Sequence, residues 1–210
     1  MSLVIVGASG HGREVLDVVE ACGVDFVGFV DDGNPDLSVL ERRGGAHLGG
    51  VDRLAEHSGT VVLGLGESAT RRHVGVSLDG AVRWEVALLH PLASVGSVVE
   101  LGDGTVVAAG ARLTTGITVG RHGYVGPNAT VGHDSVFEDY VTVLPGATIS
   151  GSVRLGIGSL VGTGANIRQG VTVGAGATVG AGAVVLDDVP EGTTVVGVPA
   201  RPLRTERDES

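Results

Sequence analysis

The stretch VGRHGYVGPNATVGHDSVF, residues 119–137, places a large apolar residue at every sixth position. The same spacing continues in both directions without a slip, from residue 89 to residue 185. A repeat of six residues with one large apolar position predicts a parallel β-helix, in which each hexad forms one side of a coil and about three hexads complete it. The seventeen apolar positions are Leu89, Val95, Leu101, Val107, Leu113, Val119, Val125, Val131, Phe137, Val143, Ile149, Leu155, Val161, Ile167, Val173, Val179 and Val185.

Glycine follows the same repeat. The chain has 37 glycines in 210 residues, yet 42% of its residues are hydrophobic and its mean hydropathy is +0.32, which indicates a buried core rather than disorder. In residues 89–190, eighteen of twenty glycines lie either directly after the apolar residue or three residues after it. Glycine at these two positions is expected where the chain turns a tight corner and needs positive φ or close backbone approach.

Four consecutive hexads have another residue where the second glycine would stand: His122, Asn128, Asp134 and Tyr140. His, Asn and Asp tolerate a left-handed backbone, so a plain turn role stays open for His122 and Asn128, whereas Tyr140 lacks that explanation. Because function often overrides a local rule, we expect the site near this gap. His133, two residues after its apolar position and beside Asp134, is the candidate general base; an incidental surface histidine is the alternative.

The first 86 residues alternate strands and helices. The pattern predicts strands at residues 3–6, 26–30 and 60–65, and helices after residue 12, at 51–56 and at 68–77. This is a βαβ arrangement with a parallel sheet. We therefore divide the chain into a Rossmann-like domain (1–86), a β-helix (87–190) and a C-terminal extension (191–210).

The loop from Gly7 to Gly12 joins a strand to a helix, where backbone amides and the helix dipole favour a phosphate group. Asp31 and Asp32 follow the second strand, where a ribose-binding acid would stand. The glycine spacing is not G-x-G-x-x-G, and the domain is about half a full dinucleotide fold. A nucleotide ligand is favoured over a redox dinucleotide.

Composition argues against several classes of protein. The net charge of −10 and pI near 5.0 disfavour a nucleic-acid binder. No apolar run reaches the roughly 18 residues of a membrane span, and the single cysteine, Cys22, fits a reducing cytoplasm. The chain has no lysine, which excludes Schiff-base chemistry on the chain. His90, His122 and His133 occupy different hexad positions and form no zinc triad, so we expect no metal.

Motifs along nearly the whole chain resemble one bacterial family, the left-handed β-helix acyltransferases of the sialic-acid O-acetyltransferase-like type, which includes UDP-amino-sugar N-acetyltransferases. The motifs are VIVGASGHGREVLDVVE (4–20), GFVDDG (28–33), LGLGES (63–68), LLHPLASVG (88–96), VGHD (131–134) and VVGVPARPL (195–203). The resemblance implies a left-handed helix and a homotrimer with acetyl-CoA bound between adjacent β-helices. It also implies that the N-terminal domain delivers a nucleotide sugar to a histidine at the subunit boundary.

The resemblance also implies roles for residues. His133 matches the catalytic base and Asp134 the acid that supports it. Thr142 stands where some members have a histidine near the acetyl carbonyl, so the oxyanion contact stays open between Thr142 and a backbone N–H. Gly126 stands where others have an asparagine seven residues before the base, and the two departures leave the identity of the acceptor open. Backbone groups of Thr163 and Ala181 would contact CoA. The substrate-binding positions are Ser9, Gly10, His11, Asp31, Asp32 and Gly66.

The expected function is therefore transfer of an acetyl group from acetyl-CoA to the amine of a nucleotide-linked amino sugar. Transfer to a sugar hydroxyl is the alternative within the same family. From other classes, a non-catalytic nucleotide-binding scaffold and a trimeric metal hydratase remain as alternatives.

Overall fold

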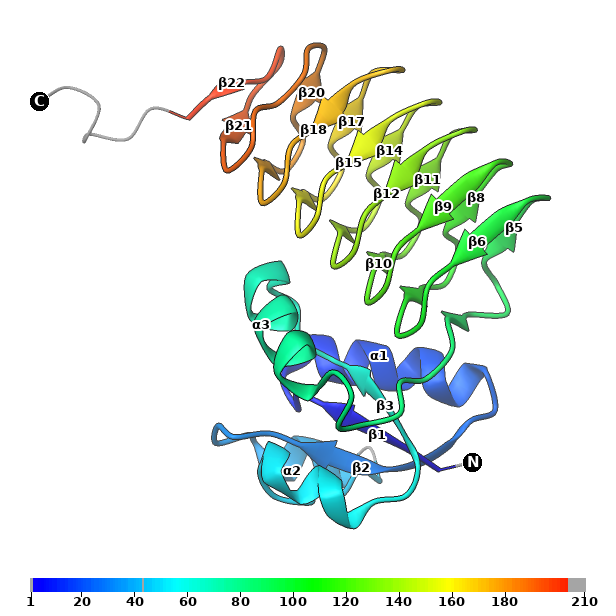
Figure 1. The fold of residues 1–210 in the computed structure, drawn as a ribbon, viewed down its shortest axis with the longest axis vertical. Helices are drawn as coiled ribbons and strands as arrows, with labels where there is room; N and C mark the ends of the chain where they lie inside the picture. The colour runs from blue at the N-terminus through cyan, green and yellow to red at the C-terminus, as the bar shows by residue number, and fades with distance from the viewer. Residues whose placement is uncertain (1, 43, 204–210) are drawn as a thin grey trace, which may run out of the picture.

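The computed structural model describes residues 2–42 and 44–203; the end of the predicted C-terminal extension, 204–210, lies outside them. The N-terminal part is a three-stranded parallel sheet with strand order β2-β1-β3 and short helices (Figure 1). The predicted strands and helices are present, together with a short helix α2 that the pattern did not indicate. The elements are β1 (Ser2–Val6), α1 (Gly10–Ala21), β2 (Asp25–Val30), α2 (Leu37–Arg42), the 3₁₀ helix η1 (Val51–Glu56), β3 (Thr60–Leu63) and α3 (Ser68–Leu78).

The predicted β-helix is confirmed as a parallel solenoid of about six coils. Strands 18 residues apart pair in parallel, as Tyr124 with Thr142, so three faces result. Face one holds β4 (Leu88–Leu89), β7 (Val106–Val107), β10 (Tyr124–Val125), β13 (Thr142–Val143), β16 (Leu160–Val161), β19 (Thr178–Val179), β21 (Thr194–Val196) and the antiparallel β22 (Arg201–Pro202). Face two holds β5 (Ser94–Val95), β8 (Arg112–Leu113), β11 (Thr130–Val131), β14 (Thr148–Ile149), β17 (Asn166–Ile167) and β20 (Val184–Val185). Face three holds β6 (Val99–Leu101), β9 (Ile117–Val119), β12 (Val136–Phe137), β15 (Arg154–Leu155) and β18 (Thr172–Val173).

The corners explain both groups of glycines. Directly after the apolar residue, a Cβ would meet the backbone of the next coil, as at Gly132, where it would lie 2.5 Å from the nitrogen of Gly151. Three residues after the apolar residue, the backbone is left-handed at every glycine, and it stays so at six positions where glycine is missing. Tyr140, which the sequence reasoning set apart as unsuited to a turn, has φ 61° like its neighbours. Among the described residues, those other than glycine with positive φ are Val98, His122, Asn128, Asp134, Tyr140 and Ser152.

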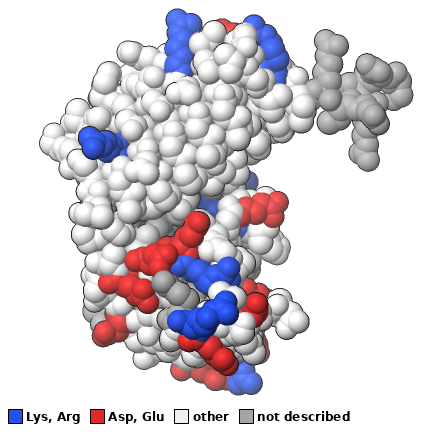
Figure 2. All heavy atoms as spheres, turned by 180° about the vertical axis from the view of Figure 1, so that it is seen from behind, with Lys and Arg blue, Asp and Glu red and all other residues white. Residues whose placement is uncertain are grey.

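The N-terminal domain packs on face one through α1 and α3, which lie between its sheet and the β-helix (Figure 1). The outward side chains of face one are apolar here: Leu88, Val106 and Tyr124 are buried against the α1 core. On the other faces, outward residues such as Arg112 and Arg154 are exposed. Charged side chains gather on the N-terminal domain in Figure 2, while the solenoid in that view is mostly uncharged.

The three corners of the solenoid are named by the faces that they join. We call the corner from face one to face two the first corner, the corner from face two to face three the second, and the corner from face three to face one the third.

Candidate active site

His133 and Asp134 lie together on the second corner, just after β11. The Nδ1 of His133 is 2.8 Å from Oδ2 of Asp134, and the two side chains are 53% and 68% exposed. A carboxylate accepts, so the imidazole donates its Nδ1–H and keeps Nε2 free to take a proton. The left-handed backbone of Asp134 (φ 58°) turns its carboxylate back over Gly116 of the preceding coil. The predicted pair is therefore formed, and its geometry suits a general base.

A second group of predicted residues lies at the carboxyl ends of β1, β2 and β3. Asp31 and Asp32 line a pocket of about 170 Å³ together with Gly7 and Gly33. Both carboxylate oxygens of Asp31 accept backbone N–H groups, from Ala8 and Gly33, each at 2.7 Å. Asp31 thereby ties the loop after β1 to the loop after β2. The carboxyl end of a parallel sheet is where open α/β folds bind ligands.

The glycine loop leads into this pocket and also meets the β-helix. Ser9 and Gly10 are exposed at the start of α1, where the first backbone N–H groups of a helix have no partner within the helix. The ring of His11 packs edge-on against Tyr124, with 4.4 Å between ring centroids. Burial and the nearby Arg71 charge lower the pKa of His11 to about 4, so its ring is neutral at pH 7. Gly66 lies against His11, since a Cβ there would be 3.4 Å from the His11 Cβ.

Arg71 on α3 joins the two domains, and the sequence reasoning did not single it out. Its side chain is 2% exposed, and its guanidinium donates only to oxygens. Burial lowers its pKa to about 10, which still leaves it charged at pH 7. Nothing in the helix pattern distinguishes it from the adjacent, exposed Arg72. The acceptors are the carbonyls of Leu65, Gly66, His122, Tyr140 and Val141 and the hydroxyl of Thr142.

Thr142 and the gap residues His122 and Tyr140 belong to this domain contact. The Thr142 hydroxyl is fully buried, 2.6 Å from Arg71 Nη2 and 2.8 Å from Ser68 Oγ. His122 is 1% exposed at the third corner, with Trp84 edge-on at 4.4 Å and Tyr140 stacked at 5.0 Å between ring centroids. Two of the four residues in the glycine gap thus serve docking of the N-terminal domain.

Comparison with known proteins now adds to this geometry. Residues 2–78 match the family model described as PglD N-terminal domain. The acetyltransferase domain of PglB from Neisseria gonorrhoeae FA1090 is 34% identical, with a TM-score of 0.84, over 96% of this chain and 99% of that one. The chain belongs to the hexapeptide-repeat sugar acetyltransferase family. Its solenoid is accordingly the left-handed β-helix of these acyltransferases.

Two further structures resemble this acetyltransferase. A histidine-to-asparagine mutant of perosamine N-acetyltransferase from Caulobacter crescentus, in complex with CoA and GDP-perosamine, is 28% identical with a TM-score of 0.90 over 98% of both chains. WeeI from Acinetobacter baumannii AYE is 29% identical with a TM-score of 0.83, over 97% of this chain and all of that one. Comparison with curated protein sequences gave no match.

The single acetyltransferase chain does not bring all predicted site residues together. The pocket at the carboxyl ends of β1, β2 and β3, which we call the N-terminal pocket, is lined by N-terminal residues alone. His133 lies on the corner between faces two and three, the corner opposite face one. Thr163 and Ala181 are exposed on the first corner in consecutive coils, where Gly182 N donates to the Thr163 carbonyl at 2.9 Å. With Thr142 buried at the domain contact, the predicted residues thus form four separate groups on one chain.

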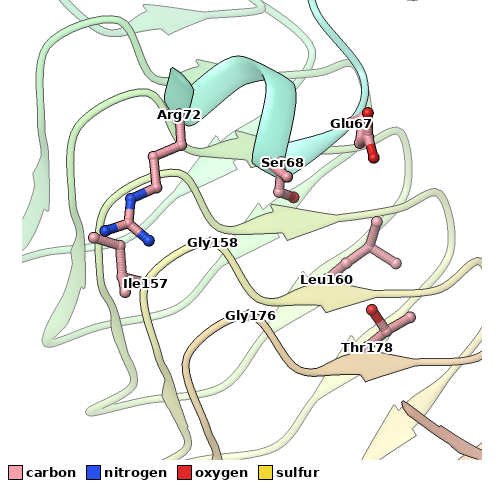
Figure 3. Close-up of a pocket in the computed structure, with 9 residues that line it drawn as sticks. Glu67, Ser68, Arg72, Ile157, Gly158, Leu160, Gly176 and Thr178 are labelled. Atoms are coloured by element: carbon pink, nitrogen blue, oxygen red, sulfur yellow. The ribbon is translucent and has the colours of Figure 1, made fainter. Parts of the chain in front are cut away.

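A further pocket, of about 210 Å³, opens between α3 of the acetyltransferase and face one (Figure 3). Glu67, Ser68 and Arg72 line it from the start of α3, and Leu160 and Thr178 from the solenoid. The predicted substrate residue Gly66 stands between Leu65, which lines the N-terminal pocket, and Glu67, which lines this one. Within residues 2–42 and 44–203, no three His, Cys, Asp or Glu side chains are grouped to hold a metal ion. None of the helices there has the length and apolar character needed to cross a bilayer.

Proposed function

We propose that this protein transfers the acetyl group of acetyl-CoA to the amine of a nucleotide-linked amino sugar, with His133 as general base. The observation that carries the proposal is the exposed His133–Asp134 pair, with its Nε2 free, on a solenoid of the acetyltransferase family. The perosamine enzyme was solved with CoA and GDP-perosamine, and the PglB domain also with acetyl coenzyme A. Mutants of the perosamine enzyme replace one histidine by asparagine or alanine, which agrees with a histidine at the centre of the reaction.

The reaction follows from the geometry of the pair. The sugar amine attacks the thioester carbonyl carbon while Nε2 of His133 takes one of its protons. The C–N bond forms and the C–S bond breaks, and the imidazolium returns the proton to the departing CoA thiolate. Asp134 holds the ring through Nδ1 and stabilises its cationic form. Since the Thr142 hydroxyl is held by Arg71 and Ser68, we assign the oxyanion contact to a backbone N–H.

The assembly proposed for this reaction is a homotrimer. His133 lies on the corner opposite face one and does not line the N-terminal pocket of its own chain, so in this proposal a neighbouring chain supplies the nucleotide sugar. Ser9, Gly10, His11, Asp31, Asp32 and Gly66 would hold that substrate, and Thr163 and Ala181 would contact CoA in the groove between two solenoids. A lone cysteine and these two substrates fit the cytoplasm.

Thiol release from acetyl-CoA tests the function against a panel of UDP- and GDP-linked amino sugars. We expect release with at least one of them and an alkali-stable amide product; an alkali-labile ester would indicate the hydroxyl-directed alternative. His133→Ala should lower kcat by about 10²–10⁴-fold, the usual contribution of a positioned base. His57→Ala, which changes a histidine outside both pockets, is the control. Thiol release unaffected by His133→Ala contradicts the assignment, and binding without release indicates a scaffold.

Subunit mixing tests the shared site. His133→Ala lacks the general base, and Asp32→Ala alters the N-terminal pocket. Each variant alone should therefore have low acetyltransferase activity. When equal amounts of the two variants assemble at random, about a quarter of all sites pair an intact pocket with an intact His133 of the next chain, so activity should return to about that level. Mixtures no more active than the separate variants, or a monomer by light scattering, contradict an intersubunit site.

A further inference from the structure

Gly151 departs from the two positions that nearly all glycines of the β-helix occupy. It lies two residues after the apolar Ile149, where every other hexad from 89 to 190 has a residue with a side chain. Ala175 and Ala181 stand at the same hexad position, so the corner backbone accepts a Cβ there. Gly151 is also not among the residues with positive φ. The turn itself therefore does not require glycine at residue 151.

The imidazole of His133 does require it. Gly151 lies one coil beyond His133, and the adjacent Ser152 N donates to the His133 carbonyl at 2.7 Å. A Cβ on Gly151 would lie 2.5 Å from Nε2, 2.6 Å from Cε1 and 2.9 Å from Cδ2 of His133. These distances are far inside van der Waals contact, and they involve three atoms of one ring. The ring lies over the bare Cα of Gly151.

We infer that Gly151 is a positioning residue that leaves the space in which the His133 ring lies. In that place Nδ1 reaches Asp134 at 2.8 Å and Nε2 sits at the corner, above the next coil. A methyl group on residue 151 would push the ring outward and disturb the Asp134 contact or the direction of Nε2. The inference rests on the proposed role of His133 as general base, because a displaced base works poorly.

The test compares two opposite changes at the same hexad position. Gly151→Ala should lower kcat by about 10²-fold, the cost of a misplacement near 1 Å, with unfolding midpoints close to those of the unchanged protein. Ala175→Gly removes a methyl group from a corner position with no histidine in the preceding coil, since residue 157 there is isoleucine. It should leave kcat unchanged. A Gly151→Ala variant with full activity overturns the inference.

A double variant shows whether the methyl group acts through the ring. In the His133→Ala background, Gly151→Ala should cause no further loss of rate. Losses that multiply would mean that Gly151 acts elsewhere, which overturns the inference. If Gly151→Ala alone fails to fold, recovery of folding in the double variant supports a conflict with the ring, and failure of both overturns it.

Histidine side-chain NMR separates this inference from the proposed function. The His133 signals, identified by their loss in His133→Ala, should move in Gly151→Ala and stay in place in Ala175→Gly. Unmoved signals in Gly151→Ala overturn the positioning whatever the rate. Moved signals with no effect of His133→Ala on the rate would instead overturn the general-base role and leave the placement of the ring established.

Discussion

His122 and His133 lie eleven residues apart in the same solenoid, yet the structure treats them in opposite ways. His122 is 1% exposed at the third corner, between Trp84 and Tyr140, and among the described residues neither ring nitrogen has a hydrogen-bond partner. His133 is 53% exposed at the second corner and pairs with Asp134. Whether a histidine of this repeat packs in the protein interior or is available for a reaction thus depends on whether another part of the protein covers its corner.

The N-terminal domain covers the third corner at His122 and Tyr140. Its α3 brings Arg71 to the carbonyls of His122 and Tyr140, and a Cβ on Gly75 would be 2.7 Å from the Tyr140 hydroxyl. This contact closes the third corner against solvent. The second corner lies opposite face one and remains open, which leaves the His133–Asp134 pair available to a ligand and to another chain.

The largest expected effect comes from giving both histidines the same replacement. Asparagine tolerates positive φ and has a smaller side chain, so the His122 backbone turn should survive. His133→Asn should lower kcat by about 10²–10⁴-fold with an unchanged unfolding midpoint. His122→Asn should cost about 1–3 kcal/mol of unfolding free energy and leave kcat of the folded protein within about two-fold. Steady-state thiol release and urea unfolding measure both, and a reversed pattern would refute the division of roles.

Removing the charge that closes the third corner should give the next largest effect. Arg71→Met would leave buried carbonyl oxygens without their side-chain donor, including those of His122 and Tyr140. We expect a loss of about 3–5 kcal/mol in the free energy of unfolding, measured by urea denaturation. Arg72→Met, one residue along α3 and exposed, should stay within about 0.5 kcal/mol. Equal effects of the two changes would mean that the buried guanidinium contributes little to domain docking.

The solenoid could be predicted because its six-residue period depends on residues that are close together in the sequence. The His133–Asp134 pair was predictable for the same reason, since adjacent residues on one corner meet whatever the rest of the chain does. The burial of His122 and Tyr140 was not, because it depends on where α3 docks. Arg71 was missed on the same ground, and so was the engagement of both Asp31 oxygens by backbone N–H groups of two loops. Tertiary contacts of this kind leave no periodic trace.

Low pH should destabilise the contact between the N-terminal domain and the solenoid, which buries His11 and His122. Burial lowers the pKa of both His122 and His11 to about 4, from the ordinary value of 6.5. Between those values the unfolded chain binds more protons than the folded one, so the free energy of unfolding is fully retained above pH 6.5 and falls as the pH drops toward 4. The slope is at most about 1.4 kcal/mol per pH unit for each histidine.

Urea unfolding across that pH window measures this effect. His122→Asn should reduce the slope, and a second change, His11→Asn, should reduce it further. An unchanged slope in the double variant would mean that the acid sensitivity arises outside the domain contact.

The smallest expected effect contrasts two residues on the second corner itself. Val98 and Asp134 have φ 57° and 58° and lie two coils apart. Val98 is β-branched and 77% exposed, so its left-handed backbone carries a cost of about 1–2 kcal/mol with little packing to offset it. After the added chain entropy of glycine, Val98→Gly should raise the free energy of unfolding by about 1 kcal/mol and leave kcat unchanged.

Asp134→Gly likewise removes a side chain from a left-handed position, but next to the proposed general base. The free energy of unfolding of this variant should stay the same or rise. Its kcat should fall, because Nδ1 of His133 loses the carboxylate that orients the ring. Urea midpoints and thiol-release rates of the two variants, measured side by side, decide the matter. A stability loss in Val98→Gly would refute the cost assigned to the left-handed corner, and full activity in Asp134→Gly would show that the turn, rather than the reaction, explains the aspartate. If both variants are more stable and only Asp134→Gly loses kcat, the left-handed backbone at residue 134 is retained because the reaction needs the Asp134 carboxylate.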